Sequence, residues 1–161
     1  MDKTKKLTLA AVLTAIAVVG SLLSFPVLGS RCAPVQHMVN VFCAVLLGWR
    51  YGLGAAFTAS LLRNLLGLGS VLAFPGSMFG AFFSGIVYAR TKNILLTICA
   101  EALGTGIIGG LAAYPIAILF MGKAAGEVAF YVYVIPFLIS TTCGAILAGL
   151  VVNRFKKFFG A

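Results

Sequence analysis

Charged side chains and clusters of proline, glycine and asparagine divide the chain into six long apolar segments. An apolar run of about 20 residues is long enough to cross the hydrocarbon core of a bilayer as an α-helix. The second and third segments are shorter, so we expect neighbouring helices to cover their ends. The segments lie at Leu7–Leu28, Ala33–Gly48, Tyr51–Leu66, Val71–Tyr88, Ile94–Met121 and Val128–Val152. The pattern predicts an all-α membrane protein with six transmembrane helices in a single domain over residues 1–161.

The amino-acid composition excludes a water-soluble fold. Of the 161 residues, 61% are hydrophobic and only 9% are charged, whereas soluble domains are typically about a quarter charged. The chain carries 12 basic and 3 acidic residues, a net charge of +9, but no basic stripe follows a polar face. The charge therefore indicates contact with anionic lipid head groups and no nucleic-acid partner.

The positions of the basic residues predict how the helices are oriented, because cytoplasmic segments of membrane proteins collect lysine and arginine. With the N-terminus inside, nine basic residues fall on the cytoplasmic side: Lys3, Lys5, Lys6, Arg50, Arg90, Lys92, Arg154, Lys156 and Lys157. Only Arg31 and Lys123 then lie outside, and Arg63 falls within a span. This asymmetry predicts that both ends of the chain face the cytoplasm.

A few ionisable or amide side chains interrupt the apolar spans. Such groups are costly in lipid, so each requires a partner, a cavity or a ligand. They are Gln36, His37, Asn40, Arg63, Asn64 and Glu101. His37 and Asn40 are three residues apart and therefore share one face of the second helix, close to its outer end. We take these six residues as candidates for a binding site.

Arg63 and Glu101 are the two charged candidates. At a rise of 1.5 Å per residue, Arg63 lies about 18 Å above the cytoplasmic surface and Glu101 about 12 Å above it. The long arginine stem brings the two within reach of each other if the third and fifth helices are neighbours. The pair would then either join two helices or form a polar floor beneath a pocket open to the outside, and the two roles are compatible.

Two aromatic residues complete the candidate site. Phe74 stands at the start of the fourth segment beside a free helix N-terminus, where unpaired N–H groups could hold a ligand acceptor. Tyr131 belongs to an aromatic group at the outer ends of the last two segments, where an aromatic belt is typical of membrane proteins. Both are therefore placed near the outer side with the polar candidates.

Motifs for catalysis are missing from the sequence. No phosphate-binding loop is present, and Gly104–Gly109 matches the dinucleotide pattern GxGxxG only in its letters, inside an apolar helix. Cys32, Cys43, Cys99 and Cys143 are scattered and lack the spacing of a metal site. We therefore expect no enzyme, no metal and no cofactor. With one intramembrane acid and no internal repeat, the chain also lacks the features of an autonomous transporter.

Small residues recur at four-residue spacing in several helices, where they allow close approach between helices in lipid. For most of these helices, ordinary packing within the bundle explains the pattern. The first helix is different, because Ala11 and Ala15 belong to a stripe of small residues. We expect this stripe to dock on another membrane protein.

Four motifs together resemble a known family over nearly the whole chain. They are Ala33–Asn40 (APVQHMVN), Ser60–Gly69 (SLLRNLLGLG), Ala73–Gly80 (AFPGSMFG) and Gly104–Gly109 (GTGIIG). In combination they resemble the ThiW family, substrate-binding S components of energy-coupling-factor (ECF) transporters associated with the thiazole precursor of thiamine. The resemblance implies a six-helix bundle of the S-component type in the plasma membrane of a prokaryote.

The resemblance also implies partners. An S component captures a vitamin precursor from outside, and a membrane T component with two cytoplasmic ATPases drives its release. In related S components a small-residue pair on the first helix meets the T component, and Ala11 and Ala15 occupy the matching positions here. Family pockets lie toward the outer side, where our candidate residues are also placed.

Two questions stay open at the level of sequence. The expected ligand is the hydroxyethylthiazole half of thiamine, and thiamine itself or its pyrimidine precursor are the alternatives, with or without a phosphate. A structural or assembly subunit of a membrane complex is the competing class of function, and it would bind no small molecule. Only the transport function predicts a polar pocket on the outer side.

Overall fold

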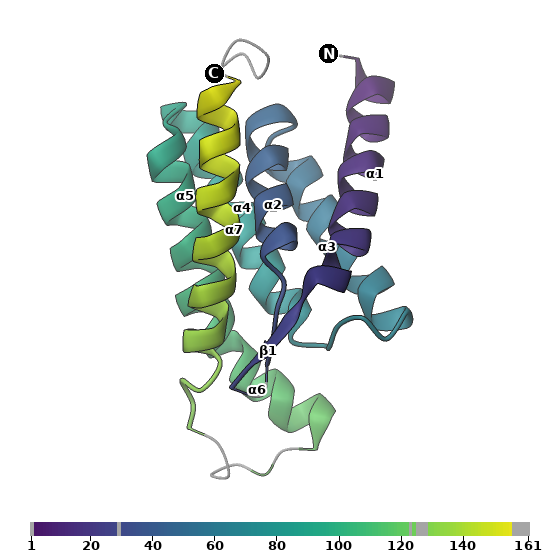
Figure 1. The fold of residues 1–161 in the computed structure, drawn as a ribbon, viewed down its shortest axis with the longest axis vertical. Helices are drawn as coiled ribbons and strands as arrows, with labels where there is room; N and C mark the ends of the chain where they lie inside the picture. The colour runs from purple at the N-terminus through teal and green to yellow at the C-terminus, as the bar shows by residue number, and fades with distance from the viewer. Residues whose placement is uncertain (1, 29, 123, 125–128, 156–161) are drawn as a thin grey trace.

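The computed structural model of the chain describes residues 2–28, 30–122, 124 and 129–155. Most of its helices run roughly along one axis, and the start of the first helix lies at the same end as the close of the last (Figure 1). The α-helices are α1 (Lys3–Gly20), α2 (Pro34–Leu46), α3 (Trp49–Leu65), α4 (Ala73–Thr91), α5 (Ile94–Leu103), α6 (Gly110–Met121) and α7 (Val134–Arg154). Within the described residues the fold is therefore a helical bundle, as the sequence predicts.

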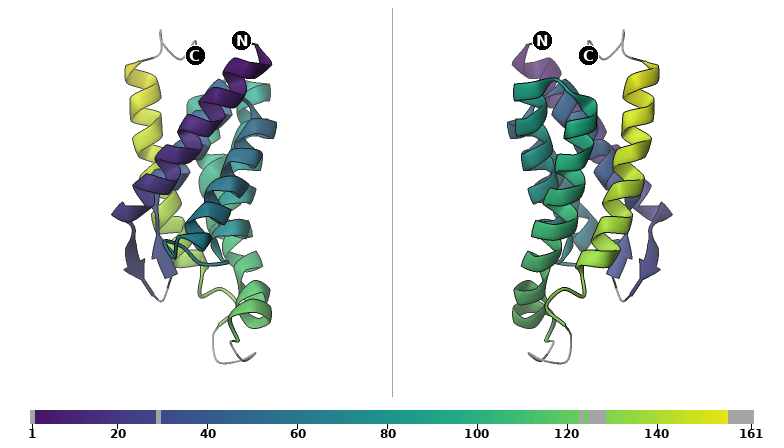
Figure 2. Two further views of the ribbon diagram at one scale, coloured as in Figure 1. Left: turned by 90° about the vertical axis from the view of Figure 1, so that its right-hand side faces the viewer. Right: turned by 90° about the vertical axis from the view of Figure 1, so that its left-hand side faces the viewer.

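The bundle is built around α2 and α4. Helix α2 packs against α1, α3, α4, α5 and α7, and α4 packs against α2, α3, α5 and α6. Helix α1 lies at one side, against α2 and α3, and α7 lies at another, against α2 and α5 (Figure 2). A polar side chain on the inner faces of α2 and α4 is therefore shielded from lipid by other helices.

Three helical segments are long and apolar enough to cross a membrane, judged by length and composition. They are Lys3–Leu23, Ile94–Met121 and Val134–Arg154. Large apolar side chains cover the outside of the bundle, among them Val19, Leu95 and Leu150. An outer surface of this kind belongs in lipid, which supports a membrane protein. The prediction of six spans remains a prediction, and α2 in particular, with 13 residues, is only about 20 Å long.

The first apolar segment does not form one helix to Leu28, and this prediction is wrong. Helix α1 ends at Gly20, and a short 3₁₀-helix, η1 (Ser21–Leu23), follows it. The remaining residues form strand β1 (Phe25–Val27), which pairs antiparallel with β2 (Ser30–Cys32). Pro26 explains the change, because proline disfavours a helical conformation in the residue before it and cannot extend a helix. The predicted all-α fold is therefore incomplete, because the structure also contains this small β-hairpin.

The fifth and sixth segments also differ in detail from their predicted form. The fifth spans the predicted residues but contains a π-helix, η2 (Gly104–Gly109), between α5 and α6. Helix α6 runs obliquely at the end of the molecule away from the termini (Figure 1). The last helix begins at Val134, six residues after the predicted start at Val128. Val128 and the basic residues Lys123, Lys156 and Lys157 lie outside the described residues.

Apart from Arg31 and Arg63, the described basic residues gather at the end of the molecule that holds the termini. Lys3, Lys5 and Lys6 lie in the first turns of α1, and the Lys6 ammonium is 6.0 Å from the centre of the Tyr51 ring at the start of α3. Arg154 closes α7 at this same end. The charge asymmetry of the sequence is thus also an asymmetry of the fold.

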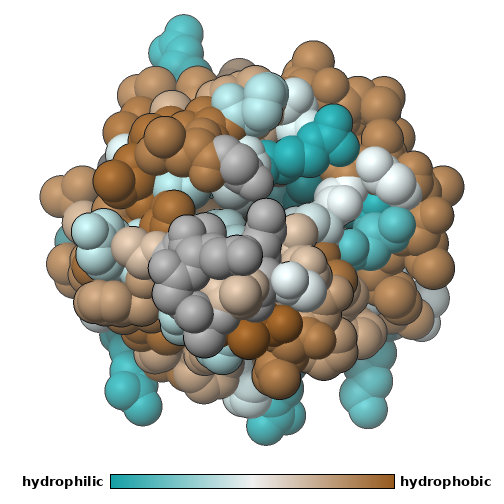
Figure 3. Space-filling view, turned by 90° about the horizontal axis from the view of Figure 1, so that it is seen from below, coloured by the Kyte–Doolittle hydropathy of each residue, from teal (hydrophilic) through white to brown (hydrophobic). Residues whose placement is uncertain are grey.

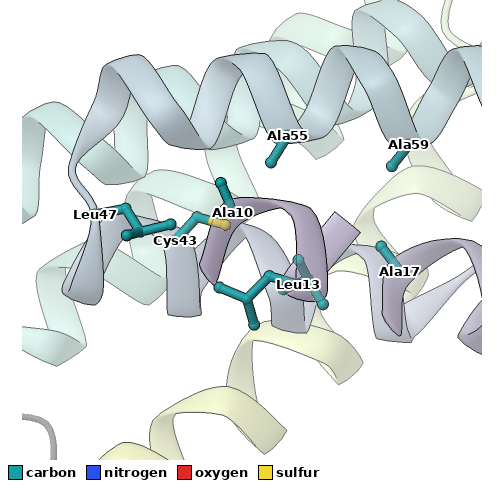
Figure 4. Packing of buried hydrophobic residues seen from close by; sticks show 8 residues of the cluster. Ala10, Leu13, Ala17, Cys43, Leu47, Ala55 and Ala59 are labelled. Carbon is teal, nitrogen blue, oxygen red and sulfur yellow. The ribbon is translucent and has the colours of Figure 1, made fainter. Parts of the chain in front are cut away.

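Small side chains form the contact between α1 and its neighbours. Figure 4 shows them between the three helices, which are α1, α2 and α3. The buried members of the cluster are Ala10, Leu13, Ala17, Val39, Cys43, Leu47, Ala55 and Ala59. Because most of them are small, the three backbones approach closely, which is typical of helix packing in lipid.

Candidate ligand-binding site

Glu101 on α5 is the centre of a buried polar network. Its side chain is fully buried, with 0% of its surface exposed. Oε1 accepts hydrogen bonds from Asn40 Nδ2 at 2.9 Å and Thr105 Oγ1 at 3.3 Å, and His37 Nδ1 lies 3.1 Å away. Oε2 accepts from Ser84 Oγ at 3.1 Å. Four polar groups from α2, α4 and η2 therefore compensate the loss of water around this carboxylate.

A glycine on α4 makes room for the carboxylate. A Cβ atom placed at Gly80 would lie 2.6 Å from Glu101 Oε1 and would also overlap the hydroxyl of Thr105. Helix α4 can therefore pass beside the network only because residue 80 has no side chain. Thr105 itself comes from η2, so the π-helix and Gly80 together bring α5 and α4 into contact around Glu101.

A chain of amide groups extends the network toward the C-terminal end of α3. Asn40 Nδ2 also donates to the Ser77 carbonyl at 3.1 Å. Gln36, one turn earlier on α2, donates from Nε2 to Ser77 Oγ at 3.0 Å and to Asn40 Oδ1 at 3.4 Å. Arg63 Nη1 donates to Gln36 Oε1 at 3.4 Å. Because Gln36, His37 and Asn40 share the inner face of α2, this helix carries the middle of the network.

The predicted direct pair between Arg63 and Glu101 is not present, which corrects the prediction. Among the described residues the ion pairs within 4.0 Å are Lys5 with Asp2 and His37 with Glu101. The premise of neighbouring third and fifth helices fails as well, because α4 and α2 pack against both and lie between them. Arg63 and Glu101 are instead opposite ends of the hydrogen-bonded chain that runs through Gln36 and Asn40.

A narrow cavity of about 30 Å³ adjoins the Arg63 end of the chain. Space of this size holds one or two water molecules. Most of the residues that line it are polar, and they come from β2, α2, α3, α4, η2 and α7. The lining residues are Ser30, Arg31, Ala33, Gln36, His37, Arg63, Ser70, Leu72, Ala73, Gly76, Ser77, Thr105, Phe137 and Ser140. Hydrophilic side chains gather within a mainly hydrophobic face at this end of the molecule, opposite the termini (Figure 3).

Two short segments cover the cavity. The hairpin is tied to α7 through Ala33 N, which donates to Ser140 Oγ at 2.8 Å. The connection between α3 and α4 is held by Asn64, whose Nδ2 donates to the carbonyls of Ser60 at 2.8 Å and Ser70 at 2.9 Å. The two segments contact each other through Arg31 Nη1, which is 3.5 Å from the Gly67 carbonyl. This exposed, long hydrogen bond is the weakest part of the cover.

Gly67 sets the path of the connection between α3 and α4. Its φ of +70° is left-handed, which glycine adopts without cost. Gly67 N donates to the Asn64 carbonyl at 3.1 Å, and Leu68 N donates to the Arg63 carbonyl at 2.8 Å. This pair of bonds is a Schellman motif, the common way to end a helix at a glycine. It stops α3 just beyond Arg63 and holds the arginine at the cavity.

The structure brings five of the eight candidate residues together. Gln36, His37 and Arg63 line the cavity, while Asn40 and Glu101 lie directly behind it in the network. Asn64 shapes the cover but does not line the cavity. Phe74 faces Phe57, with 5.6 Å between ring centres, and borders an apolar groove on α4. Tyr131 is 54% exposed and packs on Phe130.

Sequence reasoning missed the hydroxyl groups of the site. Ser77, Ser84 and Thr105 supply or accept hydrogen bonds in the network, and Ser140 anchors the hairpin. Serine and threonine are common in membrane helices, so their identity alone does not separate site residues from packing residues. Two of them do lie inside quoted motifs, Ser77 in Ala73–Gly80 and Thr105 in Gly104–Gly109.

The small-residue stripe of α1 lies on another side of the bundle. Ala11 and Ala15 are exposed. They border a groove of about 470 Å³ whose other wall is formed by α3 residues such as Gly54 and Thr58. The groove is mostly apolar and is separate from the polar cavity. Within the described part of the chain, no group of three or more His, Cys, Asp or Glu residues could hold a metal ion.

Long apolar helices that enclose a buried polar network and a small cavity define a class: a helical membrane protein with a polar interior. The chain belongs to the thiamine-precursor transporter family (ThiW), whose family description matches residues 7–158. The search of curated proteins and the search of solved structures found no match. The family assignment therefore rests on the sequence over almost its whole length, and it agrees with the helical fold.

Proposed function

We propose that this chain is the substrate-binding S component of an ECF transporter and that it captures the hydroxyethylthiazole precursor of thiamine. The observation that carries the proposal is the polar cavity lined by Gln36, His37 and Arg63 inside an apolar bundle. A polar group inside a membrane bundle is costly and commonly marks a substrate path. Membership of a thiamine-precursor transporter family supports a solute of this kind.

The chemistry of the cavity suits a small ring with a few polar atoms. Among the lining residues, Gln36, Ser77 and His37 carry donors and acceptors, while Phe137 and Leu72 supply apolar surface. Ligand sites commonly combine an apolar lining with a few convergent polar groups. The hydroxyl and ring nitrogen of hydroxyethylthiazole match the polar lining groups, and the ring itself matches the apolar ones.

Binding requires the cavity to widen. Its volume is about 30 Å³, whereas a cavity of about 150 Å³ is needed to hold a single benzene ring. The hairpin and the connection between α3 and α4 are joined by the exposed Arg31–Gly67 bond. We infer that the cover separates there to admit the ligand, while the helix-borne network around Glu101 stays in place.

The remaining parts of the proposal concern assembly and location. The exposed pair Ala11 and Ala15 would dock on a membrane T component, because small residues permit close backbone contact without a permanent interface. Two cytoplasmic ATPases would supply the energy. The chain would cross the prokaryotic plasma membrane six times with both ends inside, in accord with the basic residues at one end of the fold.

Calorimetric titration of the purified chain tests the proposal. Hydroxyethylthiazole should bind more tightly than thiamine or the pyrimidine precursor. His37→Ala and Asn40→Ala should each lower the affinity by about 5- to 150-fold, the equivalent of about 1–3 kcal/mol for a buried group left unpaired. Unchanged affinity in both variants would remove the site assignment. Absence of binding by all three compounds would favour a structural subunit instead.

A further inference from the structure

The guanidinium of Arg63 is buried without a counter-ion among the described residues. Only 3% of the residue is exposed. Its Nε atom has no hydrogen-bond partner there, and its Nη1 atom makes one long bond, 3.4 Å, to the neutral Gln36 amide. The two described carboxylates, Asp2 and Glu101, pair with Lys5 and His37. Arg63 is therefore a cation that the described part of the chain does not neutralise.

A second guanidinium faces the same cavity. Arg31 lies on β2 and lines the cavity with Arg63. The described lining residues include no aspartate or glutamate. Two arginines without an acid at one small cavity raise its positive potential, because the two positive charges repel each other. The cost of an unpaired buried cation is several kcal/mol, so the arrangement is stable only if something else provides the negative charge.

The geometry of the groups suits an oxyanion. Arginine presents its N–H donors as a planar fork that matches carboxylate and phosphate oxygens. The unpaired Nε of Arg63 is one of these donors, and serine hydroxyls of the lining, at Ser30, Ser70 and Ser77, add further ones. These donors converge from β2, α3 and α4 and from the connection between the two helices.

We propose that the ligand supplies the counter-ion of Arg63: the cavity binds a ring compound that carries an oxyanion, a phosphate ester or a carboxylate, held by Arg63 and Arg31. This inference rests on the proposed function and narrows its substrate to an anionic form of the thiazole precursor. The neutral ring contacts the apolar lining residues, and the oxyanion lies toward the cover, where Arg31 reaches it from the hairpin.

Comparison of a neutral ligand with an anionic one tests the inference. The probes are hydroxyethylthiazole, its phosphate monoester, the matching carboxylate and inorganic phosphate, each titrated into the purified chain. The better of the two anionic compounds should bind at least about 30-fold more tightly than the alcohol, the usual effect of completing a buried charge pair. Arg63→Met should abolish this preference, and Arg63→Lys, which keeps the charge without the fork, should retain part of it.

Control variants separate the role of Arg63 from other effects. Arg50→Met changes the same residue type at the opposite end of α3 and should leave the preference intact. Ligand-free Arg63→Met should melt no lower than the wild type, because it removes an unpaired buried cation. A lower melting temperature of Arg63→Met would show that Arg63 already has a counter-ion within the chain. Glu127 is the only acidic side chain outside the described residues. A Glu127→Gln variant with a lower melting temperature would identify Glu127 as the counter-ion of Arg63. A lower melting temperature in either variant, Arg63→Met or Glu127→Gln, would overturn the inference.

The outcomes also distinguish the inference from the proposed function. Equal binding of the alcohol and the anionic compounds, unaffected by Arg63→Met, would overturn the oxyanion site and leave thiazole capture standing. Absence of binding by every ring compound would overturn both.

A lipid head group carries the same phosphate chemistry and is the other source of an oxyanion. The titrations are therefore repeated in nanodiscs of phosphatidylcholine and in discs that contain phosphatidylglycerol. Equal affinity for the phosphate monoester in both supports a soluble ligand. If the affinity for the phosphate monoester falls when phosphatidylglycerol is added, the site binds a lipid head group, and the proposed anionic thiazole substrate is wrong.

Discussion

At the scale of single residues, the two charged ends of the polar network differ in how many hydrogen-bond partners they have. Glu101 accepts from Asn40, Thr105 and Ser84 and contacts His37, whereas Arg63 has one long bond to Gln36. A buried group with all its partners stabilises a unique arrangement, while an unpaired one is a common mark of function. We therefore assign Glu101 to the architecture of the site and Arg63 to its ligand.

Replacement of Glu101 should distinguish the carboxylate's shape from its charge. In Glu101→Gln, the amide oxygen can take the position of Oε1, which faces three donor groups, and the amide nitrogen can donate to Ser84 Oγ. We expect a loss of stability of about 1 kcal/mol. Glu101→Leu removes the acceptor shared by all four groups and should cost about 3–5 kcal/mol. Thermal unfolding in detergent measures both, and equal losses would contradict the network.

The sequence identifies several of these residues and misses their connections. Composition makes any amide or charged side chain in a span conspicuous, so Gln36, Asn40 and Glu101 can be found by inspection. The choice of partner depends on which helices are neighbours, and no pattern along one helix contains that information, so the direct pair with Glu101 was wrong.

At the scale of elements, close contact between α4 and η2 positions the network. Gly80 and Gly76 face this contact from α4, and Gly104 and Gly109 face it from η2. The absence of side chains brings the backbones together, and the π-helix turns Thr105 toward Glu101. π-Helical turns within α-helices are often found at functional sites, which agrees with the place of η2 beside the cavity.

Gly80→Ala tests this contact. The added methyl group would overlap Thr105 and come within 2.6 Å of Glu101 Oε1, so we expect a loss of about 1–3 kcal/mol in unfolding free energy. Gly54→Ala on α3 is the matched control, because nothing lies within 4 Å of its added Cβ. It should stabilise the helix by about 0.5–1 kcal/mol. Similar melting temperatures for the two variants would refute the close approach.

Helix α1 gives a second test at this scale. Ala11 and Ala15 are exposed beside the α1–α3 groove, so Ala11→Trp with Ala15→Trp should abolish uptake by the assembled transporter and leave ligand binding by the isolated chain intact. Val12→Trp, also exposed on α1 but outside the groove, is the control and should transport normally. Loss of binding together with uptake would show that the stripe serves the bundle rather than a partner.

The helices themselves were largely predictable, and the exceptions have clear reasons. Charges, Gly48 and Asn93 mark helix ends, and Asn93 indeed caps α5 by accepting from Leu95 N and Leu96 N. The hairpin was missed because Phe25–Val27 is as apolar as the helix before it. The π-helix was missed because it adds no polarity change to a long apolar segment.

At the scale of the whole molecule, two sites lie on different parts of one bundle. The polar cavity lies beneath its cover at the end away from the termini, and the apolar groove of α1 and α3 lies on the side. This separation lets a ligand bind at one surface while a partner binds at another. The groove, at about 470 Å³, offers more room than the cavity of about 30 Å³, so volume alone would favour the groove for a ring ligand, whereas chemistry favours the cavity.

A crystal structure of the chain with its bound thiazole compound decides most directly whether the polar cavity or the α1–α3 groove is the ligand site. The account predicts ligand density within hydrogen-bond distance of Gln36 and His37, a wider separation of Arg31 from the Gly67 carbonyl than 3.5 Å, and an unchanged network around Glu101. Density in the groove between α1 and α3, with the polar cavity still closed, would contradict the central claim that the buried polar cluster is the substrate site.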